Sequence, residues 1–229
     1  MPTKHLKKLA GALALASLSL TAQAGEAVLD VYLARHGQTA WNLEKRLQGA
    51  TDNALNDTGK AQARQLGEKL KGVSFSAVYA SSLARARETA TLAVPDVAPT
   101  PLPALAERSF GKFEGMFEDG RDGALAEEFK RRASDPDDGL DGGESLNSQA
   151  RRVATAVEQI RHKQTQGSVL VVSHGGVTPL IMAHLLQLPA SEAAARIKQA
   201  NDEVYLVRLR GQQAPQVWKL IGKESLEQL

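Results

Sequence analysis

The sequence predicts an α/β fold: a three-layer sandwich whose mostly parallel central sheet has helices on both faces and carries a short cap insertion. Runs of strand-forming residues alternate with segments of helical periodicity, which is the pattern that covers both faces of a sheet. A polar, irregular stretch at positions 119–144 predicts the cap over the site. The strand-like runs are at positions 28–34, 77–81, 169–173, 204–209 and 216–221.

Two of the predicted helices have recognisable starts. Asn56-Asp57-Thr58 and Ser145 supply residues of the type that caps a helix, because their side-chain oxygens accept hydrogen bonds from the first free backbone N–H groups. Pro95, Pro99, Pro101 and Pro103 predict an extended connection before Glu107. Each cap precedes an apolar stripe at helical spacing: Ala63, Leu66 and Leu70 in the first helix, and Val153, Val157 and Ile160 in the second.

The first 24 residues have the pattern of a secretory signal peptide. Three lysines form a basic start, an apolar stretch follows at positions 9–20, and Ala22-Gln23-Ala24 supplies small residues for cleavage. A membrane anchor is the alternative, but it needs about 20 apolar residues, and this run is shorter and interrupted by serine and threonine. We therefore expect residues 1–24 to be removed and residues 25–229 to form one domain without stable membrane insertion. The protein is then periplasmic in a Gram-negative source and secreted otherwise.

The net charge and the cysteine content limit the classes of binding partner and the covalent modifications that the chain can have. Removal of the leader takes away three lysines and no acidic residue, so the formal charge falls from +2 to −1. General nucleic-acid binding then loses its main support, which is a basic surface. The chain has no cysteine, so it forms no disulfide and carries no lipid-modified cysteine. The 205 residues after the leader suffice for one well-buried domain.

Two histidines stand at the ends of two predicted strands. Arg35-His36-Gly37 follows the first apolar run, and Ser173-His174-Gly175-Gly176 ends the third. Open α/β sheets bind ligands outside the carboxyl ends of their strands, so both motifs are expected in one crevice. Arginine adds a permanent charge, and glycine lets the backbone come close to a ligand. The expected occupant is an anion.

Four short segments are informative as an ordered set, which spans nearly the whole chain after the leader. They are Arg35-His36-Gly37-Gln38-Thr39-Ala40-Trp41-Asn42, Ser81-Ser82-Leu83-Ala84-Arg85-Ala86, Leu105-Ala106-Glu107 with Gly111 and Glu114-Gly115, and Ser173-His174-Gly175-Gly176. In this order they resemble the phosphatase branch of the histidine phosphatase superfamily, which also includes the cofactor-dependent phosphoglycerate mutases. Gln38 departs from the Glu of many relatives, outside the expected catalytic set.

The resemblance implies that His36 is the nucleophile and forms a phosphohistidine that water later cleaves. Positive charge on Arg35 and Arg85 disfavours protonation of His36 and also neutralises the phosphate that it attacks. Each guanidinium can donate paired hydrogen bonds to phosphoryl oxygens. The expected phosphate-binding residues are Arg35, Thr39, Asn42, Arg85, His174 and, through a backbone amide at a helix start, Gly175.

An alcohol leaving group needs a proton, and the family pattern places the acid at Glu107, which then acts as a base toward water. Glu114 is the competing carboxylate. It lies in Phe113-Glu114-Gly115, where alignment with the family pattern indicates structural hydrogen bonds. Glu107 is therefore the expected general acid and base, although the chemistry of the two residues does not by itself separate them.

Neither a metal nor a cofactor is expected. The sequence has no Cys/His cluster with metal-ligand spacing. The acidic stretch at positions 135–144 lacks the Asp and Glu spacing of a calcium-binding loop, so it is expected to be a solvated loop. His162 and His184 are expected to be an exposed residue and a packing residue, respectively.

Three functions fit these residues: a phosphomonoesterase, a phosphoglycerate mutase-type phosphoryl transferase and a non-catalytic phosphoryl-group binding protein. A mutase must retain its released intermediate, and the mutase relatives use a larger cap, whereas here Glu144 comes only 37 positions after Glu107. A binder does not need both His36 and Glu107. We therefore expect an exported phosphomonoesterase acting on a small-molecule phosphomonoester. Its physiological substrate, its oligomeric state and the motion of its cap stay open from the sequence.

Overall fold

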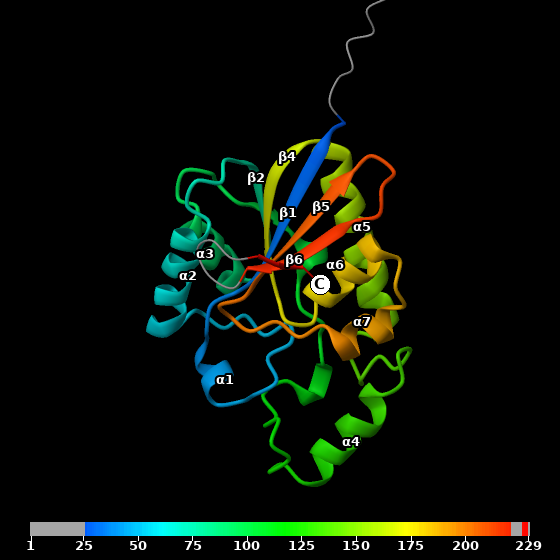
Figure 1. Cartoon of the computed structure of the whole chain (residues 1–229). Coiled ribbons are helices and arrows are strands. Elements are labelled where there is room, and N and C mark those ends of the chain that lie inside the picture. Colours follow the sequence, from blue (N-terminus) through cyan, green and yellow to red (C-terminus); the bar gives the residue numbers. More distant parts are fainter. Residues whose placement is uncertain (1–25, 221–225, 229) are drawn as a thin grey trace, which may run out of the picture.

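The computed structural model describes residues 26–220 and 226–228 (Figure 1). The predicted signal peptide and its cleavage site lie outside the described residues. The centre of the fold is a seven-stranded sheet with the strand order β3-β2-β4-β1-β5-β6-β7. The strands are β1 Val28–Arg35, β2 Phe75–Ser81, β3 Thr100–Leu102, β4 Gly167–Ser173, β5 Val204–Arg210, β6 Gln216–Leu220 and β7 Leu226–Gln228.

The mostly parallel sheet is confirmed, because β1, β2, β3, β4 and β6 all point the same way. The first four are parallel neighbours, whereas β5 is antiparallel to β1 and each strand after it reverses direction again. Every predicted strand is present, and Ile221 at the end of the last one lies outside the described residues. β3 and β7 are not among the predicted strands. β3 arises in the proline-punctuated connection, where Pro101 is tolerated because an edge strand pairs on one side.

Helices cover both faces of the sheet, as expected. α2 and α3 pack on one face, and α5, α6 and α7 pack on the other (Figure 1). Among the residues that the structure describes, no helix has the length and apolarity needed to cross a bilayer. The α-helices are α1 Ala40–Leu43, α2 Asp57–Lys69, α3 Ala84–Ala93, α4 Ala124–Ala133, α5 Leu146–Lys163, α6 Thr178–Leu186 and α7 Ala190–Arg196, and short 3-10 helices span Pro103–Leu105 and Gly111–Phe113.

The alternation of side chains along β1 separates two hydrophobic cores. Leu29, Val31 and Leu33 pack in the core beneath α5 and α6, whereas Ala34 packs in the core beneath α2 and α3. Successive side chains of a strand point to opposite faces, so one strand serves both cores. Burial of one such leucine stabilises the fold by about 1.5–3 kcal/mol relative to leaving it exposed.

Both predicted helix starts are confirmed. The Asn56 side chain accepts a hydrogen bond from the Gly59 N–H over 2.8 Å at the start of α2. The Ser145 hydroxyl accepts one from the Ser148 N–H over 3.1 Å at the start of α5. These local bonds satisfy N–H groups that have no partner within the helix.

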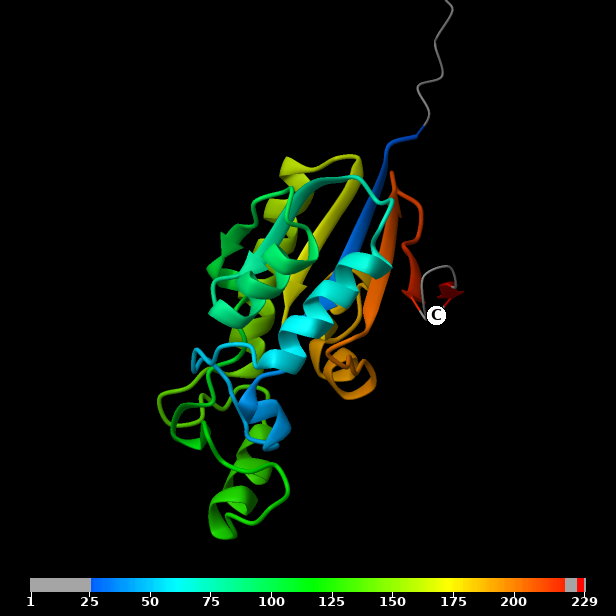
Figure 2. The same cartoon turned by 90° about the vertical axis from the view of Figure 1, so that its left-hand side faces the viewer.

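The insertion that contains α4 has a small hydrophobic core of its own. Phe113, Met116 and Leu140 are buried in it, and Phe110 and Phe129 pack against them. Figure 2 shows this green segment extending beyond the end of the sheet, on the side where the parallel strands finish. The predicted cap insertion is therefore present, and α4 forms its helix.

The register of the strands brings the two histidine motifs together. β1 and β4 pair in parallel with Arg35 opposite Ser173, and the His36 N–H donates to the Ser173 carbonyl oxygen over 3.0 Å. β2 lies on the other side of β4 and ends at Ser81. The carboxyl ends of three parallel strands thus meet at one edge, which is where ligands of such sheets bind.

Candidate active site

A cavity of about 420 Å³ lies at the carboxyl ends of the parallel strands. Its lining includes six of the residues expected in the site, namely Arg35, His36, Asn42, Arg85, Glu107 and Gly175. Sequence analysis did not single out the other lining residues as site residues: Arg46, Leu47, Gln48, Gly49, Phe110, Glu118, Gly176, Lys198 and Gln199.

The cap borders this cavity differently from the expectation. None of the described lining residues belongs to the polar stretch 119–144. The insertion contributes Phe110 and Glu118 instead, at its beginning. Within the polar stretch, Arg132 forms ion pairs with Asp138 and Asp141. The polar stretch of the cap therefore does not line the cavity, and Arg132 forms its ion pairs within that stretch.

The ring of His36 is oriented by its own loop. Its Nδ1 lies 2.8 Å from the Gly37 carbonyl oxygen. A carbonyl oxygen only accepts hydrogen bonds, so Nδ1 carries the proton and Nε2 keeps its lone pair. The residue is 2 % exposed and lines the cavity. This is the tautomer that a nucleophilic imidazole needs.

His174 is oriented by Ser81 at the end of β2. Its Nε2 lies 2.7 Å from the Ser81 hydroxyl oxygen, which also accepts from the Leu83 N–H over 3.2 Å. The Ser81 hydroxyl can donate its own proton to Nε2 while it accepts from that N–H, and His174 then carries its proton on Nδ1. Among the described residues, this buried Nδ1 has no hydrogen-bond partner. The two imidazole rings lie 5.1 Å apart between centroids.

Both imidazoles are held in the neutral form. Burial is the main cause that holds the pKa of His36 well below its usual range, and the charges of Arg85 and Arg35 lower it further. Burial likewise lowers the pKa of His174, followed by the effects of His36 and the nearby arginines. A neutral His36 can act as a nucleophile, and the arginines can still neutralise a phosphate.

The two arginines of the site are only partly satisfied by the protein. Arg35 donates from Nη1 to the Gln199 carbonyl oxygen over 2.8 Å. Arg85 donates to the carbonyl oxygens of Thr51 and Gly49 over 2.7 and 2.8 Å. The Nε atoms of both arginines are buried and have no hydrogen-bond partner among the residues that the structure describes. Guanidinium groups stay charged in proteins, so these free donors favour an anionic ligand.

Two consecutive glycines allow the backbone to pass close to the charged groups. A Cβ atom on Gly175 would lie 3.1 Å from Cζ of Arg35, and one on Gly176 would lie 2.5 Å from Oε1 of Glu107. Gly175 was expected at a helix start, but α6 begins only at Thr178, so Gly175 lies in the preceding turn. The Gly176 N–H donates to Oε2 of Glu107 over 3.0 Å.

The two competing carboxylates have different surroundings. Glu107 lines the cavity, whereas Glu114 does not. Glu114 accepts hydrogen bonds from five donors on two loops: the N–H groups of Ala50, Thr51 and Phe110, and the hydroxyls of Thr51 and Ser109. This geometry favours Glu107 as the proton-transfer group. The hydrogen bonds of Glu114 hold the two loops together.

The remaining two candidates differ in how their polar atoms are used. The Thr39 hydroxyl is fully buried, caps α1 and bonds with Gln48 over 2.8 Å, so the protein itself occupies it. Asn42 lines the cavity and uses its Oδ1 to accept from the Thr39 N–H over 3.1 Å. The arrangement leaves the Asn42 amide nitrogen as the group able to donate to a ligand, and phosphate contact by Thr39 stays a prediction.

Within the described parts of the chain, no three His, Asp or Glu side chains are grouped in a way that could hold a metal ion. His184 instead contacts Glu158 through Nε2 over 2.6 Å, on the outer surface of α5 and α6. His162 is exposed. The described lining of the cavity includes imidazole, guanidinium and carboxylate groups.

Sequence analysis missed several residues that approach the site. Gln149 is 1 % exposed and lies on the same face of α5 as Val153, Val157 and Ile160. A polar residue within an apolar helical stripe is a signal that could have identified it. Lys198 and Gln199 carry no such signal. They lie in the loop before β5 and reach the cavity only through the tertiary fold.

Comparison with known proteins decides the family. The model of the histidine phosphatase superfamily (branch 1) matches residues 31–220. The chain belongs to this superfamily. The resemblance seen in the four motifs is thereby confirmed, and the protein is a phosphatase-type enzyme.

The relatives of this histidine phosphatase carry several names. It is 38% identical over 196 residues to the metal-independent phosphoserine phosphatase of Arabidopsis thaliana, covering 81% of this chain and 78% of the relative. It is 33% identical over 195 residues to a protein of Erwinia tasmaniensis named as a probable phosphoglycerate mutase, with 82% and 87% covered. The structure is similar to that of the α-ribazole phosphatase from Shigella flexneri, with a TM-score of 0.73, 28% identity and coverage of 81% and 93%.

We expect the free energy of unfolding of this histidine phosphatase to decrease as the pH falls from about 6.5 to about 5. The folded-state pKa values of His36 and His174 are lowered, so in this window the unfolded chain binds protons that the folded chain does not. Stability is regained as the pH rises, by up to about 1.4 kcal/mol per pH unit for each histidine. Urea titrations at several pH values measure this slope.

The matched control for this slope is the exposed His162. The slope should flatten in His174→Gln and remain in His162→Gln, because burial keeps His174 from taking up a proton in the folded chain. An unchanged slope in His174→Gln would contradict the assignment of a neutral, buried imidazole.

Proposed function

We propose that the protein is an exported phosphomonoesterase that hydrolyses small-molecule phosphate esters through a phosphohistidine on His36. Glu107 acts first as the general acid and then as the general base. The observation that carries the proposal is the hydrogen bond of His36 Nδ1 to the Gly37 carbonyl oxygen, which leaves the Nε2 lone pair free in a cavity lined by two arginines.

In the first step, Nε2 of His36 attacks phosphorus and the bond from phosphorus to the leaving oxygen breaks. Arg35 and Arg85 offer donors to the phosphoryl oxygens. The Nδ1–H of His174 supplies a further donor from the buried side. A proton passes from the Glu107 carboxyl group to the leaving oxygen, so the product leaves as an alcohol.

In the second step, water attacks the phosphohistidine. Glu107, now ionised, takes a proton from the water as its oxygen bonds to phosphorus. The bond between phosphorus and Nε2 breaks, which restores neutral His36 and releases inorganic phosphate. The same carboxylate thus serves both half-reactions, and no metal ion is required by the proton balance.

The second candidate is a phosphoglycerate mutase-type transfer, favoured by the mutase name of the Erwinia tasmaniensis relative. A mutase must keep its phosphorylated intermediate in place. Here the polar part of the cap does not line the cavity, so it offers no contacts that would retain such an intermediate. Incubation with 3-phosphoglycerate separates the two functions, because a phosphatase releases inorganic phosphate and a mutase forms the isomer.

We expect His36→Ala to lower turnover by at least about a thousandfold, because the covalent route is lost rather than weakened. Turnover of a phosphomonoester panel that includes phosphoserine measures the effect, and rapid quenching of the wild type should trap an acid-labile phosphohistidine. Chelator should leave wild-type turnover intact. Near-normal turnover in His36→Ala, or loss with chelator that a divalent cation restores, would show that the mechanism is wrong.

We expect Glu107→Gln to lower kcat/KM for alkyl phosphates far more than for p-nitrophenyl phosphate, because nitrophenolate leaves without full protonation and an alkoxide does not. The comparison requires conditions in which phosphohistidine formation limits the rate. Arg85→Ala should impair both substrates similarly, since stabilisation of phosphoryl charge is common to them. Equal losses in Glu107→Gln for the two leaving groups would exclude Glu107, and a selective loss in Glu114→Gln would transfer the role to Glu114.

Export is the part of the proposal that depends on the leader alone. The basic start, the apolar stretch and the Ala-Gln-Ala end support cleavage after Ala24. Protein recovered from outside the cytoplasm should begin at Gly25 when its amino terminus is sequenced. An exported protein that still begins at Met1 would contradict cleavage, and confinement to the cytoplasm would contradict export.

A further inference from the structure

Helix α5 carries a group that touches the proton-transfer carboxylate and that the proposed mechanism does not use. Gln149 is 1 % exposed, and its Nε2 donates to Oε1 of Glu107 over 3.1 Å. A carboxylate oxygen accepts and cannot donate when ionised, so the amide must present its nitrogen to that oxygen. Gln149 is thus a buried, neutral donor aimed at one oxygen of Glu107.

The hydrogen bonds to Glu107 are distributed unequally over its two oxygens. Oε1 accepts from Gln149 and from the Arg108 N–H, the latter over 2.9 Å. Oε2 accepts from the Gly176 N–H over 3.0 Å. Each carboxylate oxygen offers two in-plane acceptor positions. Oε1 is therefore filled by protein donors, and Oε2 retains one position beside the turn that borders the cavity.

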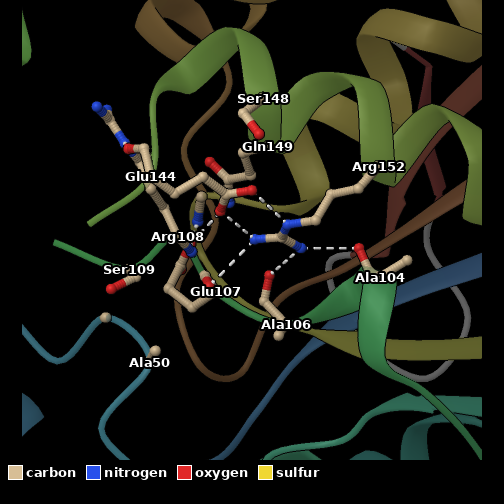
Figure 3. Close-up of polar contacts among 12 residues, drawn as sticks. Ala50, Ala104, Ala106, Glu107, Arg108, Ser109, Glu144, Ser148, Gln149 and Arg152 are labelled. Carbon is tan, nitrogen blue, oxygen red and sulfur yellow. Dashed lines mark hydrogen bonds and ion pairs between the residues drawn. The ribbon is translucent and has the colours of Figure 1, made fainter. Parts of the chain in front are cut away.

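The backbone beneath Glu107 is held by the same helix. Arg152, one turn after Gln149, donates to the carbonyl oxygens of Ala104, Ala106 and Glu107 over 2.8, 2.7 and 3.2 Å. Two further bonds of 2.7 Å tie the Arg152 guanidinium to the Glu144 carboxylate. Figure 3 shows the guanidinium reaching from α5 into this loop. The helix therefore fixes the main chain of Glu107 through Arg152 and its side chain through Gln149.

We propose that Gln149 is a positioning residue for proton transfer and that Oε2 of Glu107 is the oxygen that carries the transferred proton. By occupying Oε1, Gln149 holds the carboxyl group in the rotamer that directs Oε2 at the leaving oxygen. In the first step the Oε2–H bond breaks and the proton goes to the leaving oxygen; in the second, Oε2 takes a proton from water. This proposal rests on the proposed role of Glu107 as general acid and base.

The test uses Gln149→Met, which keeps the length of the side chain and removes the donor, and Gln149→Glu, which replaces the donor by an acceptor. Each should lower kcat/KM for an alkyl phosphate by about 10- to 100-fold, within the contribution of a positioned general acid. Each should change kcat/KM for p-nitrophenyl phosphate by less than about threefold. Gln164→Met is the matched control at the other end of α5, and it should alter neither value.

A double variant separates positioning from a merely structural effect. Adding Gln149→Met to Glu107→Gln should not lower kcat/KM for the alkyl phosphate any further, because Gln149 acts only by positioning the Glu107 carboxyl group for proton transfer. The proposal is overturned if the Gln149 variants leave the alkyl phosphate unaffected. It is also overturned if they lower both substrates equally with an intact circular dichroism spectrum, or if their effect persists in Glu107→Gln. Should Gln149→Met not fold, Gln149→Glu decides by the same criteria.

Failure of the proposed function gives a different result from failure of this inference. If Glu107→Gln alone lowers both substrates equally, Glu107 is not the proton donor and the role of Gln149 falls with it. If Glu107→Gln is selective for the alkyl phosphate and the Gln149 variants are not, the general acid stands and Gln149 does not position it.

Discussion

The hydrogen bond from the His36 N–H to the Ser173 carbonyl oxygen is the contact on which the arrangement of the site depends. It continues the parallel pairing of β1 and β4 by one residue, and so places both histidines just past the ends of adjacent strands. A shift of one residue in this register would turn each side chain to the opposite face of the sheet. The buried side chains of β1 on both faces oppose such a shift, because each face packs in a different hydrophobic core.

Given that register, the electrostatics of the site follow from burial. Two guanidinium groups are held where their Nε atoms find no protein acceptor, and two imidazoles are held neutral beside them. An unsatisfied buried donor costs about 1–3 kcal/mol. In the proposed mechanism, a phosphoryl group brings both acceptors and negative charge to these groups.

Glu107 and Glu114 are the same residue type, but their hydrogen-bonding surroundings differ. Glu114 is enclosed by donors from two loops, so its oxygens are committed to holding those loops together. Glu107 also accepts protein donors, but it lines the cavity. The clamp formed by Arg152 and Glu144 keeps its main chain fixed while the side chain stays accessible. Accessibility to a substrate, combined with a rigid support, favours Glu107 for proton transfer.

The sequence by itself determined the features that depend on neighbouring residues. Strand runs, the caps at Asn56 and Ser145, and the placement of His36 and His174 at strand ends all follow from local periodicity and side-chain chemistry. The family motifs added Arg85 and Glu107, which share the cavity in the structure.

Only the tertiary structure decided which polar atoms remain available to a ligand. The partners of Glu107 on Gln149 and Gly176 lie 42 and 69 positions away along the chain, and no local pattern encodes their distance or direction. The Thr39 hydroxyl donates to Gln48, and Arg132 of the cap pairs with Asp138, so these polar groups also have protein partners. Each polar atom can form only a few hydrogen bonds, and the groups that packing brings close to it form them first. Packing between distant segments therefore determines which of the recognised residues can still meet a substrate.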